Sequence, residues 1–114
     1  MIFSKEQRKT AYKKLPIEVQ NFIMDGETTE LIANYLKETG LTPEQEDLAD
    51  SEVLYSMYGL QTLSEAIVNI AKLSNKSVDN LSKLKTNLEN NIFSKIPSNQ
   101  ESSPVGFNKS RVVE

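Results

Sequence analysis

The segment of residues 42–74 constrains the fold most, because it contains two helix starts and one helix stop within a short stretch of chain. In each start, a threonine cap is followed three residues later by a glutamine or glutamate, a pattern called a capping box. The two boxes are Thr42 with Gln45 and Thr62 with Glu65. Between them, Gly59 can adopt the left-handed conformation that ends a helix. The segment therefore predicts a helical hairpin, with one helix over residues 43–58 and a second over residues 63–73.

Further amphipathic helices are predicted on both sides of this hairpin, because apolar residues recur there every three or four positions. The expected ranges are 4–15, 16–24, 28–39 and 77–96, with Ser4 and Ser77 as caps, Asp25-Gly26 as a turn, Gly40 as a stop and Pro97 after the last helix. The last helix has an apolar seam formed by Val78, Leu81, Leu84, Leu88 and Ile92. The sequence thus predicts an all-α fold, a bundle of five or six short helices in an orthogonal or up-and-down arrangement.

The core of this bundle is predicted from the apolar faces of the expected helices. The expected core residues are Val19, Phe22, Ile23, Leu31, Ile32, Tyr35, Leu36, Leu48, Val53, Leu54, Met57, Tyr58, Leu63, Ile67, Ile70, Leu81, Leu84, Leu88 and Ile92.

The composition changes after the last helix, which divides the chain into a helical domain over residues 1–96 and an arm over residues 97–114. The arm has two prolines, one glycine, four serines and no helical period. Such a segment is expected to be disordered alone, or ordered by a partner. The arm residues expected to bind a protein partner are Val105, Phe107, Arg111, Val112 and Val113.

The chain has no cysteine and no histidine, and this limits the chemistry it can perform. Disulfides, thiolate metal sites and Cys-His or Ser-His-Asp catalytic sites are excluded. Carboxylates do gather at the start of the 43–58 helix, where Glu44, Asp47 and Ser51 share a face, but their spacing matches no calcium loop. They are better explained by the helix dipole, which favours negative charge in the first turn. We therefore predict no catalytic, cofactor-binding or metal-binding residue, and no enzyme activity.

No run of eighteen apolar residues is present, so no membrane insertion is expected. The first residues also lack the apolar core of a signal peptide. The expected location is the cytoplasm, or a virion if the chain is phage-encoded.

Charge is distributed unevenly along the chain. The first segment is basic, with Lys5, Arg8, Lys9, Lys13 and Lys14 against Glu6. Residues 18–52 hold ten acidic side chains against Lys37 alone, and the balance turns positive again over residues 72–95. Such asymmetry can guide the approach of partner proteins or favour self-association. The alternative explanation of the uneven charge is that these residues form solvated helix faces without a binding role.

Residues 70–81 resemble the spacing of a helix-turn-helix, which predicts nucleic-acid binding as an alternative function. Lysine and asparagine side chains can contact phosphates and base edges. The candidate residues are Lys76, Asn80, Lys83, Lys85 and Asn87. Against this hypothesis, the second helix has no arginine, Asp79 would repel phosphate, and the turn lacks its usual glycine.

Three short motifs resemble a group of small helical proteins from candidate-phylum bacteria. The motifs are Leu15-Pro16-x-x-Val19-Gln20, Gly59-Leu60-x-x-Leu63 and Asn91-Ile92-Phe93. The last motif departs from the group's pattern, because no Pro-Ile-Arg follows it. The resemblance covers residues 15–96, and it implies helices in similar places but no activity and no functional residue.

The sequence therefore predicts a non-enzymatic protein-interaction module, a small structural or accessory subunit of a larger assembly such as a viral or phage particle. Its expected partner is a protein, with a homo-oligomer formed through the last helix or the arm as one form of that prediction. The helix-turn-helix nucleic-acid-binding regulator is the alternative.

Overall fold

The computed structural model describes residues 3–96, and over this range the protein is built from helices without any strand. The α-helices are α1 (Lys5–Lys14), α2 (Ile17–Met24), α3 (Gly26–Glu38), α4 (Pro43–Met57), α5 (Leu63–Ser74) and α6 (Ser82–Asn91), with 3₁₀ turns η1 (Asp79–Leu81) and η2 (Phe93–Lys95) on either side of α6. The predicted all-α fold is confirmed. Within residues 3–96, no helix is both long enough and apolar enough to cross a membrane.

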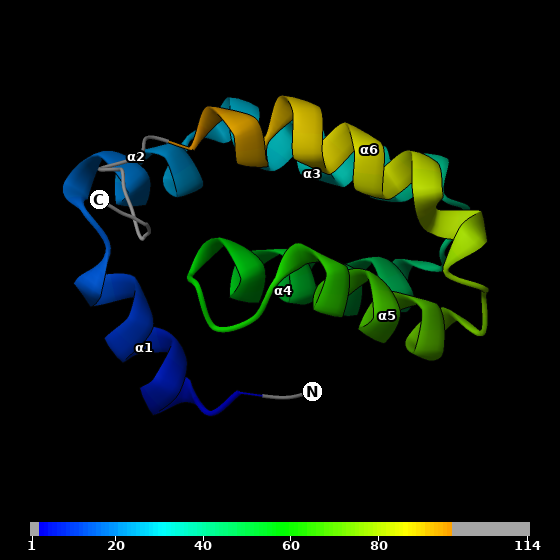
Figure 1. Ribbon diagram of the computed structural model, residues 1–114, viewed down its shortest axis with the longest axis horizontal. Helices are drawn as coiled ribbons and strands as arrows, with labels where there is room; N and C mark the ends of the chain where they lie inside the picture. The colour runs from blue at the N-terminus through cyan, green and yellow to red at the C-terminus, as the bar shows by residue number, and fades with distance from the viewer. Residues whose placement is uncertain (1–2, 97–114) are drawn as a thin grey trace, which may run out of the picture.

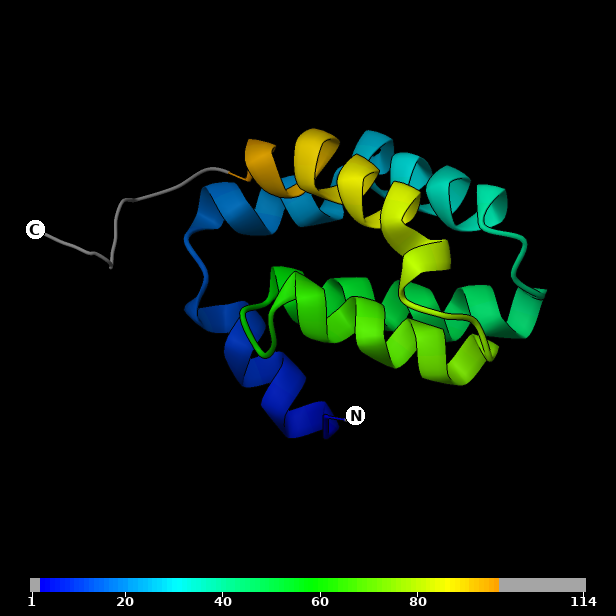
Figure 2. The ribbon, with the colours of Figure 1, turned by 45° about the vertical axis from the view of Figure 1, so that its right-hand side comes forward.

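The helices form two layers (Figure 1). α3 and α6 lie side by side in one layer, and the α4–α5 hairpin forms the other, as the turned view in Figure 2 also shows. α3 packs on α4, and α6 packs on both α3 and α5, so these four helices close around a shared core. α2 packs against α3 at one end of the molecule, and α1 stands below it, beside the connection between α4 and α5.

The hairpin begins and ends as its capping residues predict. Thr42 Oγ1 accepts the Gln45 backbone N–H at 3.2 Å, and the Gln45 side chain accepts the Thr42 N–H at 3.0 Å. α5 has the same reciprocal pair between Thr62 and Glu65, with distances of 2.8 and 3.1 Å. These bonds satisfy backbone donors that a helix start leaves without a partner.

Gly59 ends α4 in the left-handed conformation, at φ 84°. Its N–H donates to the Ser56 carbonyl at 3.1 Å, and the Leu60 N–H donates to the Tyr55 carbonyl at 3.0 Å. This is the Schellman arrangement, which a residue with a Cβ adopts only with strain. The chain can therefore reverse direction and start α5 four residues after Gly59.

Two predicted helix starts were wrong. Asp25-Gly26 is not a separate turn, because the Asp25 carboxylate accepts the Glu27 N–H at 2.8 Å and α3 begins directly at Gly26. The last α-helix begins at Ser82 and not after Ser77. The Ser77 hydroxyl does accept the Asn80 N–H, at 3.2 Å, but the turn that follows is 3₁₀ rather than α-helical.

The core lies between the two layers and agrees with most of the predicted residues. Leu36, Val53, Ile67, Ile70, Leu81, Leu88 and Ile92 are the largest fully buried side chains. Phe22, Tyr35, Leu54, Tyr58 and Leu63 are partly buried and pack against this cluster. The seam of the last helix is thus buried within its own chain from Leu81 to Ile92, while Val78 at its start is exposed.

Leu31 and Leu48 were wrongly predicted to be in the core. Leu31 is 37% exposed, because the side of α3 that faces the core is the one with Ile32 and Leu36. Leu48 is 57% exposed, while its neighbour Ala49 is fully buried. A small side chain permits two helices to approach closely. The side of α4 that packs against the neighbouring helices is therefore the side with Ala49.

We expect Ile67→Ala to lower the free energy of unfolding by about 2–5 kcal/mol, because it leaves a cavity in a fully packed site. Urea denaturation followed by circular dichroism measures this loss. The matched control is Val68→Ala, at the next residue, which is 39% exposed and for which we expect less than about 1 kcal/mol. Equal losses in the two variants would contradict the core described here.

Candidate functional site

The predicted protein-binding residues of the arm lie outside residues 3–96, and their role stays a prediction. These residues are Val105, Phe107, Arg111, Val112 and Val113.

The structure brings only part of the predicted nucleic-acid-binding set together. Asn80, Lys83 and Asn87 line a small hollow of about 130 Å³, whose opposite wall on α3 includes Glu38. The two other candidates, Lys76 and Lys85, are half-buried and do not line this hollow. A carboxylate across from the lysine reduces the positive charge that a phosphate would meet.

The acidic stretch of α4 lies partly against α3. Over residues 3–96, no three or more carboxylates are grouped closely enough to hold a metal ion. Instead, Glu46, Asp47 and Asp50 line a shallow hollow against α3. Burial raises the pKa of Asp50, and the neighbouring Asp47 carboxylate raises it further.

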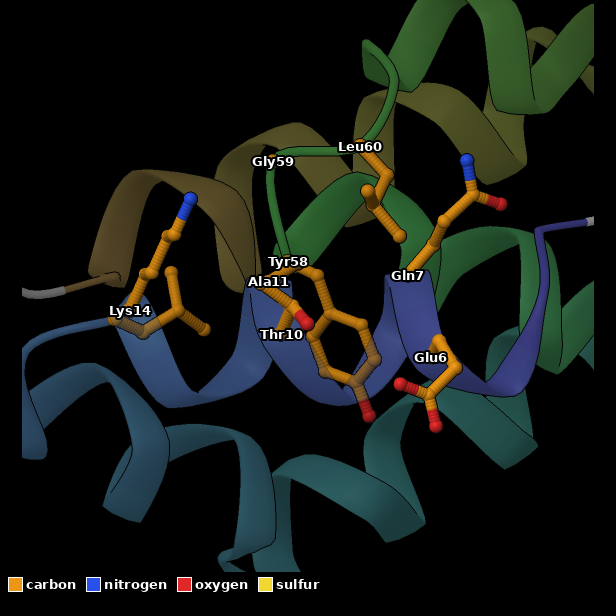
Figure 3. A pocket seen from close by; sticks show the side chains of 9 residues that line it. Glu6, Gln7, Thr10, Ala11, Lys14, Tyr58, Gly59 and Leu60 are labelled. Carbon is orange, nitrogen blue, oxygen red and sulfur yellow. The ribbon is translucent and has the colours of Figure 1, made fainter.

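A first groove of about 510 Å³ separates α1 from the α4–α5 connection (Figure 3). Tyr58 and Leu60 lie on one side, facing the α1 side chains of Gln7 and Ala11. The ring of Tyr58 meets the ring of Tyr12 edge-on, with centroids 5.6 Å apart. Burial, followed by the neighbouring Tyr12, raises the pKa of Tyr58.

α1 forms one wall of this first groove. No residue of α1 is buried. The C-terminal end of α1 is held by the Gln20 side chain of α2, whose Nε2 donates to the Tyr12 and Leu15 carbonyls at 3.1 and 2.9 Å. The rim of the groove has both Glu6 and Lys14, so it offers no single charge to a ligand.

A second groove follows the outer face of the hairpin, on the side of α4 and α5 that α3 and α6 leave uncovered. It consists of two neighbouring hollows of about 400 and 540 Å³, and Asn69 lines both. The apolar side chains along it are Phe3, Leu48, Tyr55, Leu60, Val68 and Leu73. Leu48 and Val68 are 57% and 39% exposed, so this hairpin groove presents large apolar side chains to solvent.

A polar cluster is built into the floor of the hairpin groove. The Glu52 side chain is only 7% exposed, and its Oε1 accepts from Gln61 Nε2 at 2.8 Å and from Asn69 Nδ2 at 2.9 Å. Gln61 Nε2 also donates to the Glu52 carbonyl at 3.0 Å. These bonds connect α4, the turn and α5, and they satisfy polar groups that would be costly to bury alone.

The aromatic ring of Phe3 occupies one end of the hairpin groove. It meets the Tyr55 ring edge-on, with centroids 5.1 Å apart and planes at 78°. Aromatic rings prefer this geometry to face-to-face stacking. Phe3 therefore lies against the hairpin, two residues before α1 begins.

The sequence analysis identified neither the hairpin groove nor the polar cluster. One signal was present, because Asn69 interrupts the apolar run of α5 and Glu52 directly precedes the apolar second half of α4. A polar residue inside an apolar pattern indicates a buried partner, but its identity depends on how the two helices pack.

No protein-family model matches the chain, and comparisons with curated proteins and with solved structures find no significant match. The resemblance of residues 15–96 to candidate-phylum proteins therefore stays a prediction.

We expect Glu52→Ala to lower the free energy of unfolding by about 1–3 kcal/mol, because the Gln61 and Asn69 amides lose a buried acceptor. Urea denaturation measures the loss. Glu30→Ala, at an exposed position of α3, is the control and is expected to change stability little. An unchanged stability for Glu52→Ala would show that the cluster does not hold the hairpin.

We expect Asp50→Asn to raise the free energy of unfolding at neutral pH. An acid with a raised pKa binds its proton more tightly in the folded state, so its ionisation lowers stability as the pH rises from the ordinary value of 3.8 through the raised one. The gain should disappear below pH 3.8, where the carboxyl is protonated in both states. Urea denaturation at neutral and acidic pH measures this difference in the free energy of unfolding, with Glu30→Gln as the control. A gain in stability that persists in acid would refute the argument that burial raises the pKa of Asp50.

Proposed function

We propose that this chain is a non-enzymatic protein-interaction module, a small structural or accessory subunit of a larger assembly, and that it binds a partner along the hairpin groove. The observation that carries the proposal is the exposure of Leu48 and Val68, at 57% and 39%, along a groove that Leu73 also lines. Contiguous exposed apolar side chains with a polar rim are typical of interaction surfaces.

The absence of histidine and cysteine from the chain supports a binding role over an enzymatic one. The commonest general base and the most reactive nucleophile are both missing. The clustered polar groups of the hairpin, Glu52, Gln61 and Asn69, are bonded to one another, as groups with a structural role usually are.

The hairpin groove is also suited to binding because its shape is stable. Both walls are helices of the packed core, fixed by capping boxes and by the Schellman turn. A preformed groove binds with a smaller loss of conformational entropy than a flexible surface does.

We expect a photo-reactive benzoyl-phenylalanine placed at Leu48 in the full chain to cross-link to a defined protein in extract of the producing cells. The matched control has the same residue at Ile17 on α2, which is 62% exposed but outside the hairpin groove. Gel electrophoresis and mass spectrometry of the adducts should show that protein from the Leu48 position only.

Three other results would change this interpretation of the hairpin groove. Equal adducts from both positions, or none from either, would refute the groove as the binding surface. Loss of the adduct in a chain that ends after Ile96 would show that the arm takes part in binding. Recovery of nucleic acid that is removed by salt and lost in Lys83→Glu would favour the helix-turn-helix alternative.

A further inference from the structure

The α4–α5 hairpin is strongly acidic. It has six carboxylates, and Lys72 is its one basic side chain. The carboxylates belong to Glu44, Glu46, Asp47, Asp50, Glu52 and Glu65. Glu46, Asp47 and Asp50 line the hollow against α3. Glu44 and Glu65 are therefore the carboxylates available on the groove side, and a partner there is favoured if it brings positive charge to them, because complementary charges speed encounter and disfavour wrong partners.

The acidic side chains extend to both ends of the hairpin groove. Glu44 lies one helical turn before Leu48 and so shares its face of α4, while Glu65 lines the hollow at the Val68 end. Lys72 lines the hollow at the Leu48 end. The groove thus combines the exposed apolar side chains of Leu48 and Val68 with a carboxylate near each end, which suits an amphipathic segment with basic flanks.

The protein places its own Phe3 on the groove, just ahead of a basic helix. Phe3 packs edge-on against Tyr55, and the helix that follows it, α1, is basic. α1 has five basic residues against Glu6 and buries none of its side chains. The groove side of the hairpin therefore already accepts an aromatic side chain, with positive charge on the helix that follows it.

The form of the groove favours a helix. Its walls are two antiparallel helices, and the furrow between such helices accepts the side-chain ridge of a third. Leu48 and Tyr55 are seven residues apart, which is about 10 Å along the helix axis. A partner helix would span this distance with apolar residues at positions i, i+3 or i+4, and i+7.

We propose that the hairpin groove binds a basic amphipathic helix of a partner protein, with the apolar side of that helix on the exposed side chains of Leu48 and Val68 and its lysines or arginines toward Glu44 and Glu65. This inference rests on the proposed function and specifies the chemistry of the partner.

The test uses fluorescent helical peptides and the full chain, with binding followed by fluorescence anisotropy. The probe is a leucine/lysine peptide with leucines at helical spacing; the comparison peptides are the same design with glutamate in place of lysine, and a scrambled leucine/lysine sequence. We expect the leucine/lysine peptide to bind at least about tenfold more tightly than either comparison peptide, a difference typical of a specific surface contact.

The matched variants are Leu48→Ser in the groove and Ile17→Ser outside it. Both side chains are largely exposed, so both variants should keep the far-ultraviolet circular dichroism of the native chain. We expect Leu48→Ser to weaken binding of the leucine/lysine peptide by about tenfold and Ile17→Ser to leave it unchanged.

Each other outcome would overturn the inference. Equal binding of the scrambled peptide would show a charge effect without a groove, and equal binding of the glutamate peptide would exclude the basic partner. A dimer in sedimentation that is lost in Leu48→Ser would make a second copy the occupant. If the Leu48 cross-link forms but the leucine/lysine peptide does not bind, the proposed function stands and the basic helix is the part that fails.

Discussion

The packing of α4 against α5 is the contact on which the rest of the molecule depends. Ala49 and Ala66 are both fully buried, and their small side chains let the helices come close. Larger residues, among them Val53, Ile67 and Ile70, then form the surface on which α3 and α6 rest. Because those two helices cover the hairpin from one side only, burial of apolar area stabilises the core while the opposite side stays open.

That asymmetry connects stability with the proposed function. The inner side of the hairpin is apolar and closed, whereas the outer side combines exposed leucine and valine with a buried polar cluster around Glu52. The cluster fixes the position of the turn relative to α4, and so it also fixes the shape of the hairpin groove. The walls of this binding surface are packed helices rather than flexible loops, which limits the conformational entropy lost when a partner binds.

α1 has a different relation to the fold. It buries no residue and is held by two aromatic contacts and by the bonds from Gln20 to its last turn. Its basic charge lies next to the acidic hairpin, so attraction supplements the small apolar contact at Phe3 and Tyr12. Because α1 has no buried residue, it contributes less apolar burial to stability than α3 or α6 does.

The sequence by itself determined the parts of this protein that depend on local chemistry. The capping boxes at Ser4, Thr42 and Thr62 and the glycine stops at Gly40 and Gly59 formed as predicted, because each involves atoms only a few residues apart. The apolar period also identified most of the core, including the seam of α6 from Leu81 to Ile92.

Only the tertiary structure decided which side of each helix faces inward and which polar groups meet. Leu48 is more apolar than Ala49, yet the alanine is buried, because the distance between two helices selects for size as well as polarity. The partners of Glu52 are nine and seventeen residues away, at Gln61 and Asn69, and no local pattern joins them. The hairpin groove likewise results from the way α3 and α6 cover one side of the hairpin, a packing choice that depends on the whole core at once.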